Sequence, residues 1–186
     1  MYHTHKPTNP MHRLSNLLLA LCLAPMLTGC HQPDDNQATS KAHIAALLDS
    51  LNLAAARADY TAYFGLYADS AVFAGTDATE RWDKMQFMAY AKPHFDRGKA
   101  WAFTALNRHI YIDKAGQTAW FDELLRTQMK ICRGSGVATR HANGWKIEQY
   151  ILSATIPNSL MDSITTMKTP AEDNVMESMQ QAKTRL

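Results

Sequence analysis

The chain has 186 residues, 46% of them hydrophobic and 19% charged, with a formal net charge of +2. This length suits one domain with a single core. Two of the nineteen Lys and Arg residues, Lys6 and Arg13, lie in an N-terminal segment that we expect to be removed, and the other seventeen balance the seventeen Asp and Glu. The near-neutral remainder excludes a charge-driven nucleic-acid partner.

Residues 1–29 have the pattern of a signal peptide. A weakly basic start precedes the apolar run LSNLLLALCLAPML, which is too short to span a membrane. The closing LTGC, Leu27 to Cys30, resembles the lipobox of bacterial lipoproteins. The resemblance implies lipidation of Cys30 and a membrane-anchored protein of the bacterial cell envelope that faces the periplasm. An ordinary secretory signal with a chance cysteine is the alternative, and Met11 is a second candidate start.

Residues 30–40 are polar, which predicts a flexible tether between the lipidated cysteine and the folded domain. Cys22 leaves with the signal peptide and Cys30 is acylated, so Cys132 remains alone. We therefore expect no disulfide within the mature chain. A lone cysteine beside an apolar strand is typical of a core residue, and a reactive thiol is the alternative.

Apolar residues at helical spacing predict three helices in the first half of the domain. The first runs from Ser40, as its N-cap, to about Arg57. The second follows Asp59, which can cap it. The third covers residues 83–92 and ends at Pro93. The second helix carries an aromatic stripe that either packs in the core or lines a ligand cavity: Tyr60, Tyr63, Phe64 and Tyr67.

The pattern then changes to strands. The segment SAVFAGT, residues 70–76, predicts a short strand, and the longer strands cover residues 101–113, 117–131, 134–141 and 145–156. Between these longer strands, KAG, CR and ANG suit hairpin turns, and GSG at residues 134–136 predicts a tight turn or bulge. Helices followed by antiparallel strands predict an α+β domain with the helices packed on one face of a curved sheet.

Residues 161–186 form a polar, Met-rich tail. Thr169, Pro170 and Glu172 make a capping box with proline at the first helical position, so a last helix is predicted to begin there. Val175, Met176 and Met179 are positioned to dock this helix. We interpret the tail as peripheral or partner-facing.

Several motifs follow one another between Ile44 and Leu160: YADSAVFAGTDATERW, AWFDELL, CRGSGVA and GWKIEQYILSATIPN. In this order they resemble the SnoaL-like family of the nuclear transport factor 2-like superfamily, and we assign residues 41–160 to a SnoaL-like domain. The resemblance implies a cone of N-terminal helices packed on a highly curved antiparallel sheet around an apolar pocket. It also implies a homodimer through the outer face of the sheet. It specifies no activity, because this fold hosts isomerases, cyclases, dehydratases and pure binding modules.

Ketosteroid isomerases of the same superfamily need a carboxylate base and a tyrosine that donates to the developing oxyanion. When their pattern is aligned through the shared YAD, Tyr67 to Asp69, the base position holds Gly75 and the tyrosine position holds Leu51. Asp77 is the nearest substitute for the base. The alignment argues against isomerase chemistry of that kind.

The segment AWFDELL carries two adjacent carboxylates, Asp122 and Glu123. Since side chains alternate across a strand, these two face opposite sides of the sheet and cannot share a proton. We expect one of them to meet the cavity or its rim. The other is expected to pair with Arg108 or Arg133, because a covered carboxylate is costly without a partner.

In the last strand, alternation places Gln149 on the same face as Trp145, Ile147 and Ile151. A glutamine on an apolar face either satisfies a backbone group or contacts a ligand. The sequence is compatible with both interpretations of Gln149.

The sequence shows no pattern for a metal or a cofactor. The five histidines after residue 30 have no paired ligand spacing, no cysteine pair supports zinc, and the glycines of CRGSGVA precede no helix. His94 lies at a helix end beside Tyr90 and Phe95. It is the best candidate for acid–base work, and a structural role is the alternative.

These observations lead to three hypotheses. The first is a domain that binds a small, mainly apolar molecule, without enzymatic activity, through Trp82, Tyr90, Trp101, Trp120, Asp122 and Gln149. The second is a cofactor-free lyase, cyclase or isomerase with Asp122 or Asp77 as base and His94 assisting. The third is a dimeric interaction module that docks an envelope partner through its tail.

Overall fold

The computed structural model describes residues 1–3 and 33–184. Residues 4–29 of the proposed signal peptide, and Cys30, lie outside the described residues. Helices and strands belong to the unit formed by residues 32–186. In chain order they are α1 (Pro33–Ala56), α2 (Tyr60–Gly65), β1 (Tyr67–Ala74), β2 (Arg81–Asp83), α3 (Lys84–Asp96), β3 (Thr104–Ile112), β4 (Thr118–Thr127), β5 (Lys130–His141), β6 (Gly144–Ala154), the short 3-10 helix η1 (Asn158–Leu160) and α4 (Met161–Thr184).

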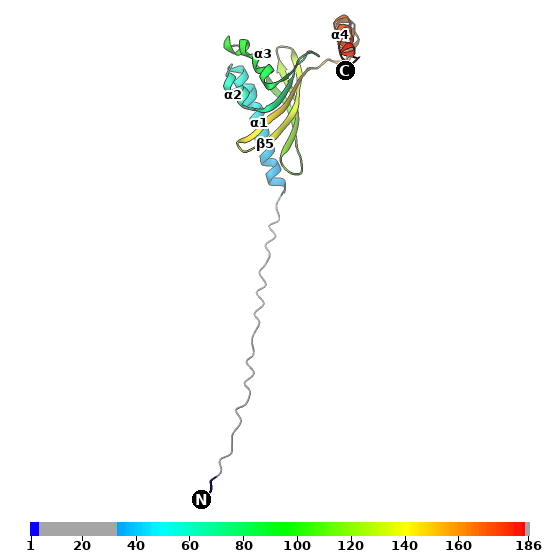
Figure 1. The fold of residues 1–186 in the computed structure, drawn as a ribbon. Coiled ribbons are helices and arrows are strands. Elements are labelled where there is room, and N and C mark those ends of the chain that lie inside the picture. The colour runs from blue at the N-terminus through cyan, green and yellow to red at the C-terminus, as the bar shows by residue number, and fades with distance from the viewer. Residues whose placement is uncertain (4–32, 185–186) are drawn as a thin grey trace. The chain divides into compact units, whose positions relative to one another are not determined.

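The strands form one sheet in the order β2-β1-β6-β5-β4-β3. Neighbouring strands are antiparallel except for β1 and β6, which run parallel. Figure 1 shows α1 against the curved sheet, with α2 and α3 near one end. The predicted α+β fold is confirmed: N-terminal helices pack on one face of a curved and mostly antiparallel sheet.

The core fills the space between α1, α2, α3 and the inner face of the sheet. From α1, Ile44, Leu48 and Leu51 are buried at the predicted helical spacing. From the sheet, Phe121 and Leu125 are buried on one face of β4, as the alternation of side chains requires. Cys132 is fully buried on β5, in agreement with the core role predicted for it.

Helix boundaries differ from the predictions at three places. α1 begins at Pro33 and therefore includes residues that we assigned to the tether. Ser40 is not its N-cap but a buried residue within the helix, and Arg140 Nη2 donates to its Oγ at 3.1 Å. α3 continues past Pro93 to Asp96. One lost backbone hydrogen bond near a helix end costs little when the following turn buries a large side chain, and Phe95 is buried there.

The third difference is α4, which begins at Met161 rather than at Thr169. Pro170 is inside the helix, and the Thr169 hydroxyl donates to the carbonyl of Thr165 at 2.7 Å instead of capping a helix start. No residue of α4 is buried, so the docking contacts predicted for Met176 and its neighbours are absent from the described residues. By contrast, Asp59 caps α2 as predicted and accepts from the Ala62 backbone N–H at 2.9 Å.

Two turn predictions were wrong. The turn between β4 and β5 is at Gln128 and Met129, whereas the predicted turn, Cys132 and Arg133, lies within β5. GSG is also part of β5. A Cβ at Gly136 would overlap the backbone of Gln149 and the ring of Phe121, so glycine is required there by close packing and not by a turn.

Candidate functional site

A cavity of about 260 Å³ lies between the helices and the concave side of the sheet. Its lining combines aromatic and aliphatic side chains with a few polar groups, which is the usual composition of a small-molecule pocket. The polar side chains are Asn52, Tyr63, Thr76, Glu80, Tyr90, His94, Gln128 and Tyr150. The apolar side chains are Leu51, Phe73, Trp82, Phe87, Ala100, Trp101, Phe103, Met129 and Leu152.

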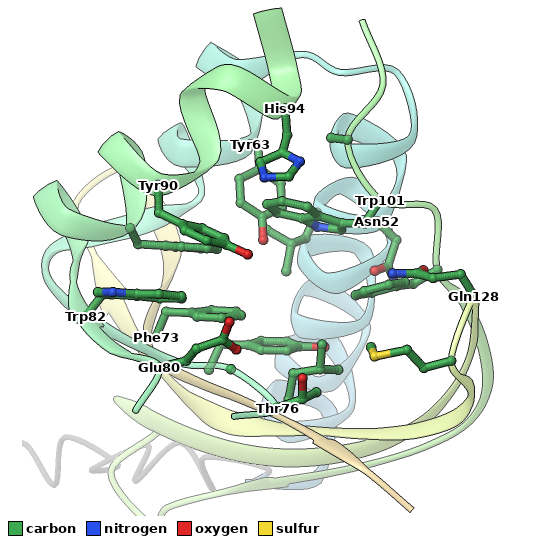
Figure 2. Close-up of a pocket in the computed structure, with 18 residues that line it drawn as sticks. Asn52, Tyr63, Phe73, Thr76, Glu80, Trp82, Tyr90, His94, Trp101 and Gln128 are labelled. Atoms are coloured by element: carbon green, nitrogen blue, oxygen red, sulfur yellow. The ribbon is translucent and has the colours of Figure 1, made fainter. Parts of the chain in front are cut away.

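The local structure of α3 positions one wall of this pocket. Asp83 and Gln86 form a capping box that starts α3 directly after β2. Phe87, Tyr90 and His94 then share one face of the helix, because they follow one another at three and four residues. The rings of Tyr90 and Trp82 stack with their centroids 4.4 Å apart. Figure 2 shows Tyr90, Trp82 and Phe73 on one side of the cavity.

Several lining rings lie in nearly parallel planes. Phe73 is within 10° of Phe87, 14° of Trp82 and 3° of Tyr150. Trp101 is within 18° of Phe87. Since these rings come from β1, β2, α3, β6 and the loop after α3, the fold and not one local motif produces the common orientation.

The buried tyrosine hydroxyls stay neutral. Tyr63 and Tyr67 hydroxyls lie 3.1 Å apart, and Tyr150 donates to Oε1 of Glu123 at 2.9 Å. Burial raises the pKa of all three phenols well above their ordinary value. Tyr63 and Tyr150 therefore contribute hydroxyl groups, and no charge, to the pocket lining.

Glu123 is 1% exposed and forms a buried ion pair with Arg108. Arg108 Nε donates to Oε2 at 2.8 Å, and Nη2 lies 2.8 Å from the same oxygen without hydrogen-bond alignment. Nη1 donates to Asp49 and to the carbonyl of Ala45. The predicted pairing of one carboxylate with an arginine is confirmed, and of the two candidates, Arg108 and Arg133, the partner is Arg108. Glu123 supports the pocket only through Tyr150, because it does not line the cavity itself.

Asp122 lies on the opposite, outer face of the sheet. Its Oδ1 is 3.3 Å from His109 Nδ1, and both side chains are exposed. Trp120 shares this face, where it is 47% exposed and stacks on Tyr111. Neither Asp122 nor Trp120 lines the pocket, and Glu123 does not line it either, so the prediction that a carboxylate of AWFDELL meets the cavity or its rim was wrong. Alternation of side chains along the strand showed that the two carboxylates lie on opposite faces of the sheet. It did not show which of these faces is the inner one.

Gln149 is also absent from the pocket lining because β6 contains one extra residue. Val137 pairs with Gln149 and the next residue, Ala138, pairs with Ile147. Glu148 therefore has no paired residue on β5. Such a bulge reverses the faces of the residues that follow. Tyr150 and Leu152 consequently line the pocket, and Gln149 and Ile151 do not.

Of the other predicted site residues, some line the cavity and one does not. Trp82, Tyr90, Trp101 and His94 lie around the cavity. Asp77 is exposed in the loop between β1 and β2, where it accepts from the backbone and hydroxyl of Thr79 and does not line the cavity.

Glu80, three residues further on, lines the cavity and was not predicted. Its position depends on the course of an irregular loop, for which the sequence carries no periodic signal.

No group of three or more His, Cys, Asp or Glu side chains is arranged to hold a metal ion within residues 1–3 and 33–184. In the same residues, no helix is both long enough and apolar enough to cross a membrane.

The helices on a curved sheet and the cavity between them define an α+β domain of the NTF2-like kind. The SnoaL-like domain family matches residues 44–157, more than half of the chain, and the protein belongs to that family. A search of curated proteins found no match.

Solved structures share the fold at low sequence identity. An NTF2-like protein of unknown function from Pseudomonas putida has 15% identity and a TM-score of 0.56, over 65% of this chain and 90% of its own. A candidate dehydratase of the NTF2-like family from Streptomyces avermitilis has 15% identity and a TM-score of 0.55, over 65% of this chain and 99% of its own. A domain of unknown function with a cystatin-like fold from Nostoc punctiforme has 16% identity and a TM-score of 0.56, over 78% of this chain and 98% of its own.

Proposed function

We propose that this protein binds a small, mainly apolar molecule in the cavity between its helices and sheet, and that it is a lipid-anchored protein of the bacterial cell envelope. The observation that carries the binding function is the cavity of about 260 Å³ with its aromatic lining. Aromatic faces provide large apolar contact area, and the few polar groups can orient a ligand.

The carboxylates Asp122 and Asp77 do not support the enzymatic alternative. Asp122 is on the outer face of the sheet and Asp77 is exposed in a loop, so neither reaches a molecule in the cavity. A general base must be within hydrogen-bond distance of the proton that it removes. The two carboxylates predicted as bases therefore give no support to catalysis, whereas the aromatic lining of the cavity supports binding.

Native mass spectrometry of the gently purified full chain tests the binding function. We expect a retained small molecule that is lost in Tyr90→Ala and kept in Tyr111→Ala. The two tyrosines form a matched pair, because they are 45% and 47% exposed and each stacks on a tryptophan, but only Tyr90 lines the cavity. An empty protein that also fails to bind indole, a flat neutral probe, in titration calorimetry would overturn the proposal.

The lipid anchor is supported by the sequence Leu27–Cys30. We expect the wild-type chain to incorporate a fatty-acid label and to sediment with the envelope fraction. Cys30→Ser should abolish both. Labelling that persists in Cys30→Ser would refute this attachment site.

The outer face of the sheet supports a homodimer. Tyr111 and Trp120 are paired across β3 and β4, and Val137 is paired with Trp120 across β4 and β5, so the three form one row of apolar side chains. Two copies that meet through this face would cover it on both. Light scattering should give a dimer for the wild type and a monomer for Trp120→Glu, whereas a monomeric wild type would refute the arrangement.

A further inference from the structure

The pocket contains a carboxylate that has no cationic partner. Glu80 is half-buried, and its Oε2 accepts only a long hydrogen bond, 3.3 Å, from the backbone N–H of Asp77. No lysine or arginine is among the lining residues. In the described part of the chain Glu80 forms no ion pair, whereas Glu123 pairs with Arg108 and Glu172 pairs with Lys168.

Gly75 allows Glu80 to take this position. A Cβ at residue 75 would overlap the carboxylate oxygen Oε2 of Glu80. Both residues line the cavity, and their backbones are joined by a 2.8 Å hydrogen bond from Gly75 N–H to the Glu80 carbonyl. Figure 2 shows the Glu80 carboxylate and the Tyr90 hydroxyl directed toward the same interior space. The loop thus delivers a negative charge to the pocket.

His94, the other residue of the lining that can carry a charge at neutral pH, does not compensate Glu80. Its Nδ1 lies 3.1 Å from Arg97 Nη2. A guanidinium can only donate hydrogen bonds, so Nδ1 of His94 is the acceptor in this contact and is directed to Arg97 rather than to Glu80. Arg97 itself is exposed and outside the lining. Glu80 is therefore the carboxylate of the lining, and no lysine or arginine of the lining lies opposite it.

The surrounding aromatic rings favour the same sign of charge. The face of an aromatic ring attracts cations, and Phe73, Trp82, Phe87, Trp101 and Tyr150 present nearly parallel planes around the cavity. Parallel planes also favour a flat molecule, because a flat ring can stack on them with offset contact. A neutral apolar ligand would desolvate Glu80 without giving it a partner, which is costly.

We propose that the ligand is a flat organic cation, a conjugated ring that carries a protonated amine or an amidinium, and that Glu80 pairs with its positive charge. An amidinium could donate two parallel hydrogen bonds to the carboxylate, the strongest arrangement for such a pair. This inference rests on the proposed binding function and narrows its ligand to one chemical class.

Titration calorimetry of the full chain with three flat probes tests the charge. Benzamidine is a cation, benzamide is its neutral counterpart of nearly the same shape, and benzoate is an anion. We expect benzamidine to bind about ten- to a hundredfold more tightly than benzamide, as a charged hydrogen bond would give, and benzoate not to bind. Glu80→Gln should abolish this preference while indole still binds. Asp96→Asn, which removes a carboxylate outside the lining, should leave it unchanged.

The outcomes separate the two proposals. Equal binding of benzamidine and benzamide, with indole bound, overturns the cation inference and leaves the binding function in place. A preference for benzamidine that survives in Glu80→Gln overturns the role of Glu80. If indole and all three probes fail to bind, both proposals are wrong.

Discussion

The carboxylate of Glu80 occupies the space that a side chain at residue 75 would need. The alignment through YAD predicts that Gly75 takes the position of the catalytic base of ketosteroid isomerases. That sequence position has no carboxylate, but the carboxylate of Glu80 lies close to it in space. Glu80 comes from five residues further along the loop, and the backbone hydrogen bond between the two residues holds them together. The loop therefore places a carboxylate beside Gly75 in space, although none is present at residue 75 in the sequence.

Gly75→Ala tests this relationship. The new methyl group should displace the end of the Glu80 side chain, which is flexible, so we expect little loss of stability. The preference for benzamidine over benzamide should fall by about tenfold, because the carboxylate leaves its position, while the affinity for indole changes little. Titration calorimetry measures the affinities for benzamidine, benzamide and indole. An unchanged preference would show that Glu80 acts from elsewhere or not at all.

A second prediction concerns the buried ion pair. Glu123→Gln leaves the Arg108 guanidinium buried with only Asp49 as an ionic partner, and we expect a loss of about 3 kcal/mol in the free energy of unfolding. Asp122→Asn, the adjacent carboxylate on the exposed outer face, should change stability by less than about 0.5 kcal/mol. Urea denaturation measures both variants. Similar losses in the two would contradict the assignment of faces.

These two carboxylates show which features of the site could be predicted from the sequence alone. Alternation along β4 placed Asp122 and Glu123 on opposite faces, because period two is a property of every strand. The cost of an unpaired covered carboxylate predicted an arginine partner, Arg108 or Arg133. It could not show which face was inside, since both faces carry an aromatic residue and a leucine. The side chains that decide this come from α1 and β6, far away in the sequence.

Irregular backbone caused two other errors in the predicted site. The extra residue Glu148 in β6 exchanged the faces of Gln149 and Tyr150, and nothing in the alternation of GWKIEQYIL signals a bulge. Glu80 was missed because its place in the pocket depends on a loop and on Gly75. By contrast, Trp82, Tyr90 and His94 are beside or within a helix with regular spacing, and their common position was accessible from the sequence.

Gly136 of β5 gives a third prediction. Gly136→Ala would place a methyl group against the Gln149 backbone and the Phe121 ring, and we expect a loss of about 1–3 kcal/mol because the backbone cannot yield easily. Gly65→Ala, where no atom lies within 4 Å of the added Cβ, is the matched control and should be close to neutral or stabilising. Urea denaturation compares them. A neutral Gly136→Ala would contradict close packing as the reason for this glycine.

The last prediction concerns pH and the turn between β3 and β4. Asp113 Oδ1 accepts from the backbone N–H groups of Gln117 and Thr118 at 2.8 and 2.9 Å, and these bonds, that from Thr118 foremost, lower the pKa of this carboxyl below its ordinary value of 3.8. A carboxyl with a lowered pKa in the folded state stabilises the protein above its unfolded pKa, and this contribution disappears as the pH falls through the folded value. Asp113→Asn should therefore melt at a lower temperature than the wild type at pH 7, and the difference should shrink steadily below about pH 4. Thermal melts of both proteins between pH 7 and pH 3 measure this, and a difference that stays constant over the range would show that the charge of Asp113 does not stabilise the turn.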